Sequence, residues 1–314
     1  MRITILGAAA GGGFPQWNCN CVNCAGLRAG TLKAKARTQS SIFIRPDAAA
    51  GPGTGAGTDG VLFNASPDIL EQIRSNPILQ PARAQRDTAI AGLVLMDGQI
   101  DHSTGLFMLR ERGSPLPLWC TDPVEEDLSQ GNPILRVLKH YCGVRRHRIA
   151  LDGSEFEVPG VPGLAFRALP LSSKAAPYSP HREQSVDGDN IGMTVRDLAS
   201  GKRLFYAPGL GQITPPVFEA MQGADCVMVD GTFWTDDEMI SMGLSKKTAR
   251  DIGHLAQSGP GGMLEWLGKL PPGTRKLLIH INNTNPILDE NSPQRAALVA
   301  AGIEVSEDGM QLTL

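Results

Sequence analysis

Long apolar runs are missing from this 314-residue sequence, and so is any strong excess of charge of one sign. A helix needs roughly 18–20 consecutive apolar residues to span a bilayer, so we expect no direct insertion into a membrane. The 29 basic residues nearly balance the 32 acidic ones and form no block, which argues against nucleic acid as a partner. The apolar run before Gly7 is too short for a signal peptide, and we therefore expect a cytoplasmic protein.

Two familiar nucleotide-binding patterns are also lacking. The glycine-rich turn after the first apolar run has neither the Gly-x-Gly-x-x-Gly spacing nor a Gly-Lys-Ser/Thr ending. What is present instead is a regular alternation of short apolar runs, helical patterns and Gly/Pro breaks along the whole chain. This alternation predicts a single α/β domain over residues 1–314. The Gly/Ala-rich segment 47–60 is interpreted as a hairpin loop between two strands.

The two halves of the chain each read as strands followed by helices. Such halves can stack as a four-layer αββα sandwich in which the strand ends meet along one edge. No sequence repeat of fixed short period is present, which excludes a solenoid. The fold class expected is therefore α/β, a four-layer αββα sandwich.

Three of the six cysteines lie within six residues, as Cys19, Cys21 and Cys24. The spacing is short enough for three sulfurs to reach one ion, and tetrahedral Zn²⁺ takes four such ligands. We predict a structural Zn²⁺ site here, with free or redox-active thiols as the alternative. The fourth ligand must come from elsewhere in the chain, and His254, Asn283 and a water molecule are the candidates.

Acidic and histidine residues crowd the end of an apolar strand in "LVLMDGQIDHSTGL", residues 93–106. The residues in question are Asp97, Gln99, Asp101 and His102. An aspartate before a helix start is also typical of an N-cap, and this reading stays open for the segment taken alone.

Other polar residues follow apolar strands or lie in loops. His280 ends one apolar strand, and Asp230 ends another, where it can orient a ligand, act as a base or cap a turn. His254, in a Gly-flanked loop, is a candidate proton donor or substrate-binding residue. The Pro-rich loop after residue 171 contains Lys174, Tyr178, His181 and Arg182, which suit a polycarboxylate ligand or, alternatively, form an ordinary solvated loop.

The segment "MDGQIDHSTGL" resembles the His-x-His-x-Asp-His loop of the metallo-β-lactamase superfamily. Asp97 and Gln99 stand where the two first histidines would be, whereas Asp101 and His102 match. The segments "VMVDGTFW", "IGHLAQ" and "LLIHINN" resemble further parts of the same superfamily. A phosphodiesterase branch shares the three-cysteine motif and completes its zinc site with a histidine, where this chain has Asn283.

Taken over the whole chain, these motifs resemble a family of pyrroloquinoline quinone (PQQ) biosynthesis proteins with the metallo-β-lactamase fold. The resemblance implies iron-dependent hydroxylation of the tyrosine-derived part of a Glu–Tyr precursor. A carrier that takes PQQ or its precursor toward the periplasm, or a residual metallo-hydrolase, is the alternative. It also implies a small-molecule PQQ precursor as partner, with a homodimer and contacts to other PQQ-pathway proteins left open.

Departures from the superfamily pattern change the metal chemistry that the resemblance implies. A histidine of the middle strand is replaced near Ser172 or Ser173, and the bridging aspartate is replaced near Pro208. The ligands that remain are Asp101, His102 and His280, with Asp97 as a candidate fourth. Two imidazoles with carboxylates suit a single Fe²⁺ with open positions better than a two-zinc hydrolase. Asp230 and His254 are the expected catalytic residues, and Gln99, Lys174, Tyr178 and Arg182 the expected substrate-binding residues.

Overall fold

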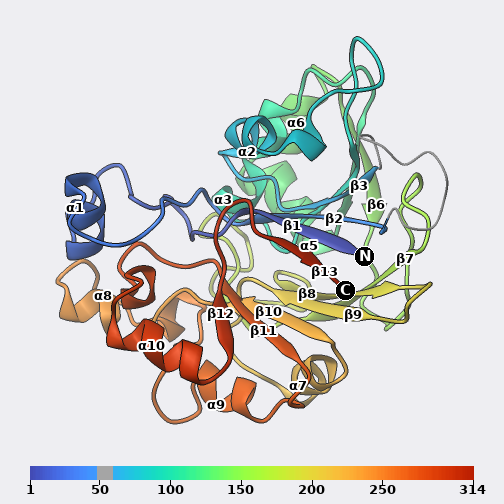
Figure 1. Ribbon diagram of the computed structural model, residues 1–314. Coiled ribbons are helices and arrows are strands. Elements are labelled where there is room, and N and C mark those ends of the chain that lie inside the picture. Colours follow the sequence, from blue (N-terminus) through green and yellow to red (C-terminus); the bar gives the residue numbers. More distant parts are fainter. Residues whose placement is uncertain (48–58) are drawn as a thin grey trace.

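Two β-sheets lie face to face at the centre of the molecule (Figure 1). The structure is a computed structural model and describes residues 1–47 and 59–314, so nearly all of the predicted hairpin loop at 47–60 lies outside the described residues. The first sheet contains, in spatial order, β13 (Gln311–Thr313), β1 (Arg2–Gly7), β2 (Ser41–Arg45), β3 (Gly60–Phe63), β4 (Ile90–Val94), β5 (Leu116–Cys120) and β6 (Val144–Arg148). The second contains β12 (Ile303–Val305), β11 (Arg275–Ile279), β10 (Cys226–Asp230), β9 (Arg203–Ala207), β8 (Ile191–Asp197) and β7 (Leu164–Pro170).

Helices cover the outer face of each sheet. Over the first sheet lie α2 (Ile69–Ser75), α4 (Gly105–Met108), α5 (Asp122–Glu126) and α6 (Ile134–Leu138). Over the second lie α7 (Pro215–Gln222), α9 (Met263–Gly268) and α10 (Pro293–Ala300). This is the predicted αββα sandwich, and the predicted fold class is confirmed.

The alternation of side chains along β10 explains why its sequence is continuously apolar. Cys226 and Met228 point into the cluster shared by the two sheets, whereas Val227 and Val229 point into the cluster beneath the outer helices. Successive side chains of a strand leave on opposite faces, so a strand covered on both faces needs apolar residues throughout. Asp230 then closes the strand as a fully buried carboxylate.

The parallel strands bring the polar segments to one edge of the molecule. The strands β3 to β6 are mutually parallel, as are β9 to β12. Asp97 follows the end of β4, Asp230 ends β10, and His280 follows β11. Ligand sites of parallel sheets form at the carboxyl ends of the strands, and the two halves here share that edge.

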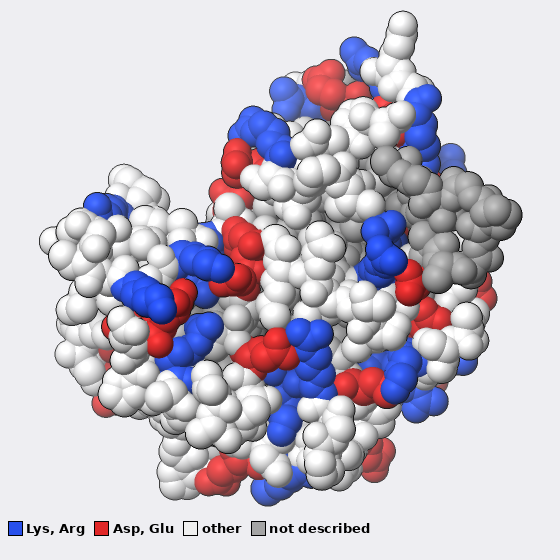
Figure 2. Space-filling model, in the orientation of Figure 1, with Lys and Arg blue, Asp and Glu red and all other residues white. Residues whose placement is uncertain are grey.

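Short elements complete the chain: α1 (Val22–Ala29), α3 (Ile100–Ser103), α8 (Glu238–Ser241) and a π-helical turn, Asp127–Gly131. No helix among the described residues has both the length and the apolar character that a membrane span requires. On the face drawn in Figure 2, acidic and basic side chains are interspersed.

Candidate metal centres

The loop that follows β4 is held in place by hydrogen bonds between side chains and its backbone. The Asn64 side-chain oxygen accepts a hydrogen bond from the Met96 amide at 3.0 Å. Further on, the Ser103 hydroxyl donates to the Gln99 carbonyl at 2.7 Å, and the Tyr178 hydroxyl donates to the Gly98 carbonyl. These contacts fix the direction in which the side chains of the loop leave the backbone.

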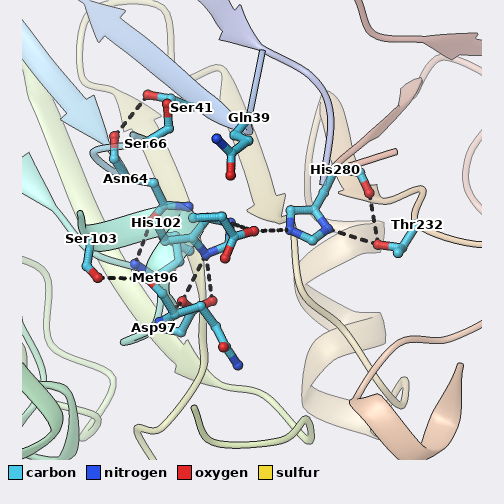
Figure 3. A network of polar contacts seen from close by, with 12 residues as sticks. Gln39, Ser41, Asn64, Ser66, Met96, Asp97, His102, Ser103, Thr232 and His280 are labelled. Carbon is cyan, nitrogen blue, oxygen red and sulfur yellow. Dashed lines mark hydrogen bonds and ion pairs between the residues drawn. The ribbon is translucent and has the colours of Figure 1, made fainter. Parts of the chain in front are cut away.

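Three potential ligand atoms converge where this loop meets the end of β11. They belong to Asp101, His102 and His280 and lie within 4.8 Å of one another. The Asp101 Oδ2 atom is 3.2 Å from His280 Nε2 and 3.8 Å from His102 Nε2. Figure 3 shows that His102 and His280 reach this point from opposite halves of the fold. His280 has a φ of 60°, a conformation that non-glycine residues adopt at some cost and that often marks a functional site.

The partners behind each imidazole set the tautomer. The Nδ1 atom of His102 is 2.9 Å from both carboxylate oxygens of Asp97, so that nitrogen carries the proton. The Nδ1 atom of His280 is 2.9 Å from the Thr232 hydroxyl, which itself donates to Asp230 at 2.6 Å. We therefore assign the proton of His280 to Nδ1 as well. In both rings the Nε2 lone pair is left for a ligand.

The three converging side chains are suited to bind a metal cation. His102 is 2% exposed, and its Nε2 atom has no hydrogen-bond partner among the described residues. A buried nitrogen lone pair facing a carboxylate is unfavourable unless a proton or a cation lies between them. Asp101, His102 and His280 would hold such a cation.

The geometry argues against the ligand role that the sequence predicted for Asp97. Its carboxylate lies behind His102, on Nδ1, whereas the other candidate ligands face Nε2. A carboxylate in that position orients the imidazole and raises its basicity. Asp97 is 4% exposed and is better described as an orienting residue.

Replacing Asp97 by Ala should weaken metal binding at this centre about 10- to 100-fold, because the ring of His102 loses the group that fixes its tautomer. Competition with a chromophoric chelator measures the affinity. Asp152→Ala, at an exposed position remote from the centre, provides the matched control. An unchanged affinity in the Asp97 variant would rule out the orienting role.

The charges around His102 make metal binding dependent on pH. Burial opposes protonation, but the carboxylates of Asp97 and Asp101 outweigh it and raise the pKa of His102 to about 9. For Asp101, burial opposes the charged form, but His102 and His280 outweigh it and lower its pKa, so this ligand is already ionised at neutral pH.

Without metal, His102 is therefore protonated at pH 7, and a cation must displace that proton. We expect about one proton to be released per ion bound, and the apparent affinity to rise about tenfold per pH unit up to pH 9. Because the pKa of His102 is raised, the proton competes with the metal ion for Nε2 up to about pH 9, and the apparent metal affinity therefore increases with pH. Calorimetry in buffers of different ionisation enthalpy measures the release, and an affinity that is flat between pH 7 and 9 would contradict it.

Asp230 and His254 form a second, adjoining pair. The Nδ1 atom of His254 is 2.6 Å from Asp230 Oδ2, which also accepts the Leu210 amide at 2.9 Å. The other Asp230 oxygen accepts from both the amide and the hydroxyl of Thr232. Burial opposes both charges, but the mutual attraction lowers the pKa of Asp230 and raises that of His254.

Asp230, His254 and His280 also bring their potential ligand atoms within 4.8 Å of one another. The oxygens of Asp230, however, are already occupied by four hydrogen-bond donors, so this group suits a cation less well than the first. Asp230 orients His254, whose ring lies 5.3 Å from that of His280 between centroids. Thr232 was assigned no role from the sequence, although the Asp-x-Thr pattern that it forms with Asp230 could have indicated one.

A cavity of about 290 Å³ opens onto these residues. Of the predicted substrate-binding residues, Gln99 and Arg182 line it, whereas Lys174 and Tyr178 do not. The Tyr178 hydroxyl is used on the Gly98 carbonyl, and the Lys174 carbonyl accepts from the Asn190 side chain at 3.2 Å. Tyr178 thus holds the loop that follows β4. Asn190 also lines the cavity, and no sequence signal pointed to it.

The positions that depart from the superfamily pattern offer few ligands to this cavity. The Ser173 hydroxyl donates to the Gly253 carbonyl at 2.7 Å. Ser172 forms a bridge with Gln212, and Pro208 has no side-chain ligand to offer. The Ser173 hydroxyl is therefore engaged by the backbone, and Pro208 cannot replace the bridging carboxylate of the superfamily pattern.

The three cysteines of the second centre converge as predicted. The sulfur atoms of Cys19, Cys21 and Cys24 lie within 4.8 Å of one another, at the start of α1. The Asn283 side-chain nitrogen lies 3.1 Å from Cys19 Sγ, 3.6 Å from Cys21 Sγ and 3.4 Å from Cys24 Sγ. The set of three thiols with one open corner fits Zn²⁺, and Asn283 lies at that corner.

Of the candidates for the fourth ligand, His254 belongs to the other centre, where it pairs with Asp230. The oxygen and nitrogen of an asparagine amide are interchanged by a simple flip, so the Asn283 oxygen can face the sulfurs equally well. Its position is 4% exposed, and its backbone carbonyl is fixed by the Asn23 side chain at 3.1 Å.

Replacing Asn283 by His should tighten zinc binding at the cysteine centre about tenfold, because imidazole is a stronger zinc ligand than a carboxamide. The rate of zinc transfer to an excess of chelator measures the change. Circular dichroism checks that the larger side chain is accommodated. A folded variant that releases zinc as fast as the parent would exclude position 283 as the fourth corner.

The two-sheet sandwich with an inward-facing aspartate and histidines at its strand ends is the architecture of the metallo-β-lactamase superfamily. The model of the β-lactamase superfamily domain matches residues 60–281. Within that superfamily, the chain belongs to the coenzyme PQQ synthesis protein B family. It is 64% identical to coenzyme PQQ synthesis protein B from Azoarcus sp. (strain BH72) over 314 residues, and 58% identical to that from Methylobacillus flagellatus over 315 residues, with full coverage of both chains in each case.

Solved structures agree with this assignment. The crystal structure of Zn²⁺-bound PqqB from Methylobacterium extorquens matches with a TM-score of 0.89 at 36% identity, covering 100% of both chains. A diphosphatase from the PhnP family matches with a TM-score of 0.66 at 19% identity, covering 100% of this chain and 97% of that one. The second likeness concerns the fold alone.

Proposed function

We propose that this chain acts in PQQ biosynthesis as an iron-dependent oxygenase that hydroxylates the tyrosine-derived part of the Glu–Tyr precursor. The observation that carries the proposal is the set of two imidazoles and one carboxylate that converges at a single point, from Asp101, His102 and His280. Non-haem iron(II) oxygenases use such a set and keep positions open for oxygen and substrate.

The neighbouring residues favour one metal over two. A dinuclear hydrolytic site holds its ions about 3.5–4 Å apart with ligands on both. Here Asp97 is turned toward the back of His102, Ser173 is bonded to a backbone carbonyl, and Pro208 offers no ligand. These positions weaken the case for a residual hydrolase.

Three residues that line the cavity would act on the substrate. Bound iron(II) supplies the redox chemistry with dioxygen. The Nδ1 atom of His254 donates its proton to the Asp230 carboxylate in a hydrogen bond. The Nε2 atom of His254 would then accept the proton of the phenol. Phe233 and Ile252 line the same cavity and provide apolar surface for an aromatic ring.

Hydroxylation inserts one oxygen atom of O₂ into an aromatic C–H bond, and the other oxygen atom leaves as water. The second half of this balance takes two electrons and two protons, which an external reductant must supply. Ascorbate is a suitable donor in vitro.

Mass spectrometry of the product provides the test. The protein is loaded with Fe²⁺ or with Zn²⁺ and incubated with the dipeptide Glu–Tyr, ascorbate and ¹⁸O₂. The proposal predicts one labelled oxygen atom in the product with iron and none with zinc. Stoichiometric binding of the dipeptide without any label, under both loadings, would favour the carrier instead.

A further inference from the structure

Arg182 lines the cavity next to Asp101, His102 and His280 and has no carboxylate partner among the described residues. Arg182 is the only arginine or lysine among the residues that line it, and they otherwise include the acidic Asp97 and Asp101. No carboxylate of the described residues forms an ion pair with Arg182. The nearby Asp189 and Glu126 face His181 instead, at 3.0 and 3.6 Å.

Among the described residues, the Arg182 guanidinium donates a hydrogen bond to a single group, a backbone carbonyl. Its Nη1 atom donates to the Ala175 carbonyl, and the Arg182 amide donates to the Ser179 carbonyl at 3.1 Å. A guanidinium has five N–H donors, and this contact leaves most of them unused. A partly buried arginine that lacks a carboxylate partner is well prepared to bind one in the two-point manner that its planar shape favours.

The remaining lining residues limit what else the ligand can be. Pro177, Phe233 and Ile252 offer apolar contact, and Gln99 and Asn190 are neutral hydrogen-bonding groups. A volume of about 290 Å³ lies at the lower end of the roughly 300–1,000 Å³ typical of small-molecule pockets. The cavity therefore suits a small-molecule ligand and not a large folded segment.

We propose that Arg182 determines substrate specificity by binding the carboxylate of an aromatic amino acid whose ring faces Asp101, His102 and His280. This inference rests on the proposed function, because it takes the aromatic ring to be the part that reaches the metal centre. The substrate class that it defines is a phenol or catechol with a free carboxylate. Arg182 acts on recognition and takes no part in the redox chemistry.

Binding of two matched probes tests the inference. The probes are 3,4-dihydroxyphenylalanine and its primary carboxamide, which differ only in the carboxylate, and binding is measured by calorimetry to protein loaded with Zn²⁺. The parent protein should bind the acid about 10- to 100-fold more tightly than the amide, as expected for a charge-assisted hydrogen-bonded pair. Arg182→Gln should bind both within about twofold of each other, and Arg182→Lys should fall between.

Arg136→Gln, at an exposed position on α6, is the matched control and should keep the parental ratio. Thermal melting and zinc content establish that each variant is folded and loaded. In turnover with an active preparation, Arg182→Gln should raise KM with little change in kcat, which separates recognition from a loss of the metal centre.

Two results would overturn the inference in distinguishable ways. If Arg182→Gln keeps the parental preference for the acid, or if the parent shows no preference, Arg182 is not the carboxylate-binding residue while the metal centre still binds the ring. If the parent binds neither probe, the ring does not reach the metal centre, and the proposed function fails together with the inference.

Discussion

Replacing His280 by Ala is expected to remove about one metal ion per chain, and with it all measurable turnover. Among the described residues that converge at this centre, His280 alone comes from the second half of the fold, and its loss leaves Asp101 and His102, which both lie in α3. A two-ligand site binds a divalent ion far more weakly than a three-ligand site. We expect a fall in activity of at least about a thousandfold at sub-millimolar iron.

Metal analysis after loading and gel filtration measures this effect, with zinc at the three cysteines as the internal standard. His140→Ala, at an exposed position after α6, is the matched control and should retain both ions. If the His280 variant keeps its full metal content, the second metal ion is not bound by Asp101, His102 and His280, and the assignment of these three ligands is wrong.

Replacing Cys24 by Ser is the second change with a large expected effect, and here the effect is on stability. Cys24 is fully buried, and its sulfur lies 3.4 Å from the Asn283 side chain, which belongs to a loop more than 250 residues away. A metal bound only by the folded state contributes its binding free energy to folding. We expect loss of the zinc and a decrease in Tm of about 10 °C or more.

Loss of zinc at the three cysteines should also weaken metal binding by Asp101, His102 and His280, because the same backbone segments carry residues of both centres. Asn283 is three residues from His280, and a Cβ atom at Gly11 would lie 3.3 Å from the Asp101 carboxylate. Loosening either segment displaces a ligand, so iron affinity should fall together with Tm. Cys142→Ser, which leaves the three-cysteine centre intact, is the control. A Cys24 variant with unchanged Tm and unchanged zinc content would contradict a structural role.

The sequence was informative where one local pattern determined the structure. The continuous apolar runs that became β4, β10 and β11 predicted buried strands, and the structure contains strands at these positions. The three cysteines were close enough in sequence to predict their convergence without knowledge of the fold. Strand β6 was not predicted, because its sequence, Val-Arg-Arg-His-Arg, has little apolar character.

The roles that depend on direction could not be predicted. Asp97 and Asp101 are both near His102 in sequence, and only the structure shows that one lies behind the ring and the other in front. Similarly, Tyr178 and Arg182 lie in one Pro-rich loop. The Tyr178 hydroxyl donates to the Gly98 carbonyl, whereas Arg182 lines the cavity. Side-chain direction in loops is set by long-range contacts that no local pattern records.

Oxygen uptake distinguishes an iron-dependent oxygenase from a carrier. The protein is prepared without metal at the open site, reloaded separately with Fe²⁺ and with Zn²⁺, and given a tyrosine- or dihydroxyphenylalanine-containing analogue together with ascorbate. We expect substrate-dependent uptake with iron, none with zinc, and none in His280→Ala with either metal. Uptake that persists in His280→Ala, or no uptake with iron despite tight binding of the analogue, would contradict this expectation.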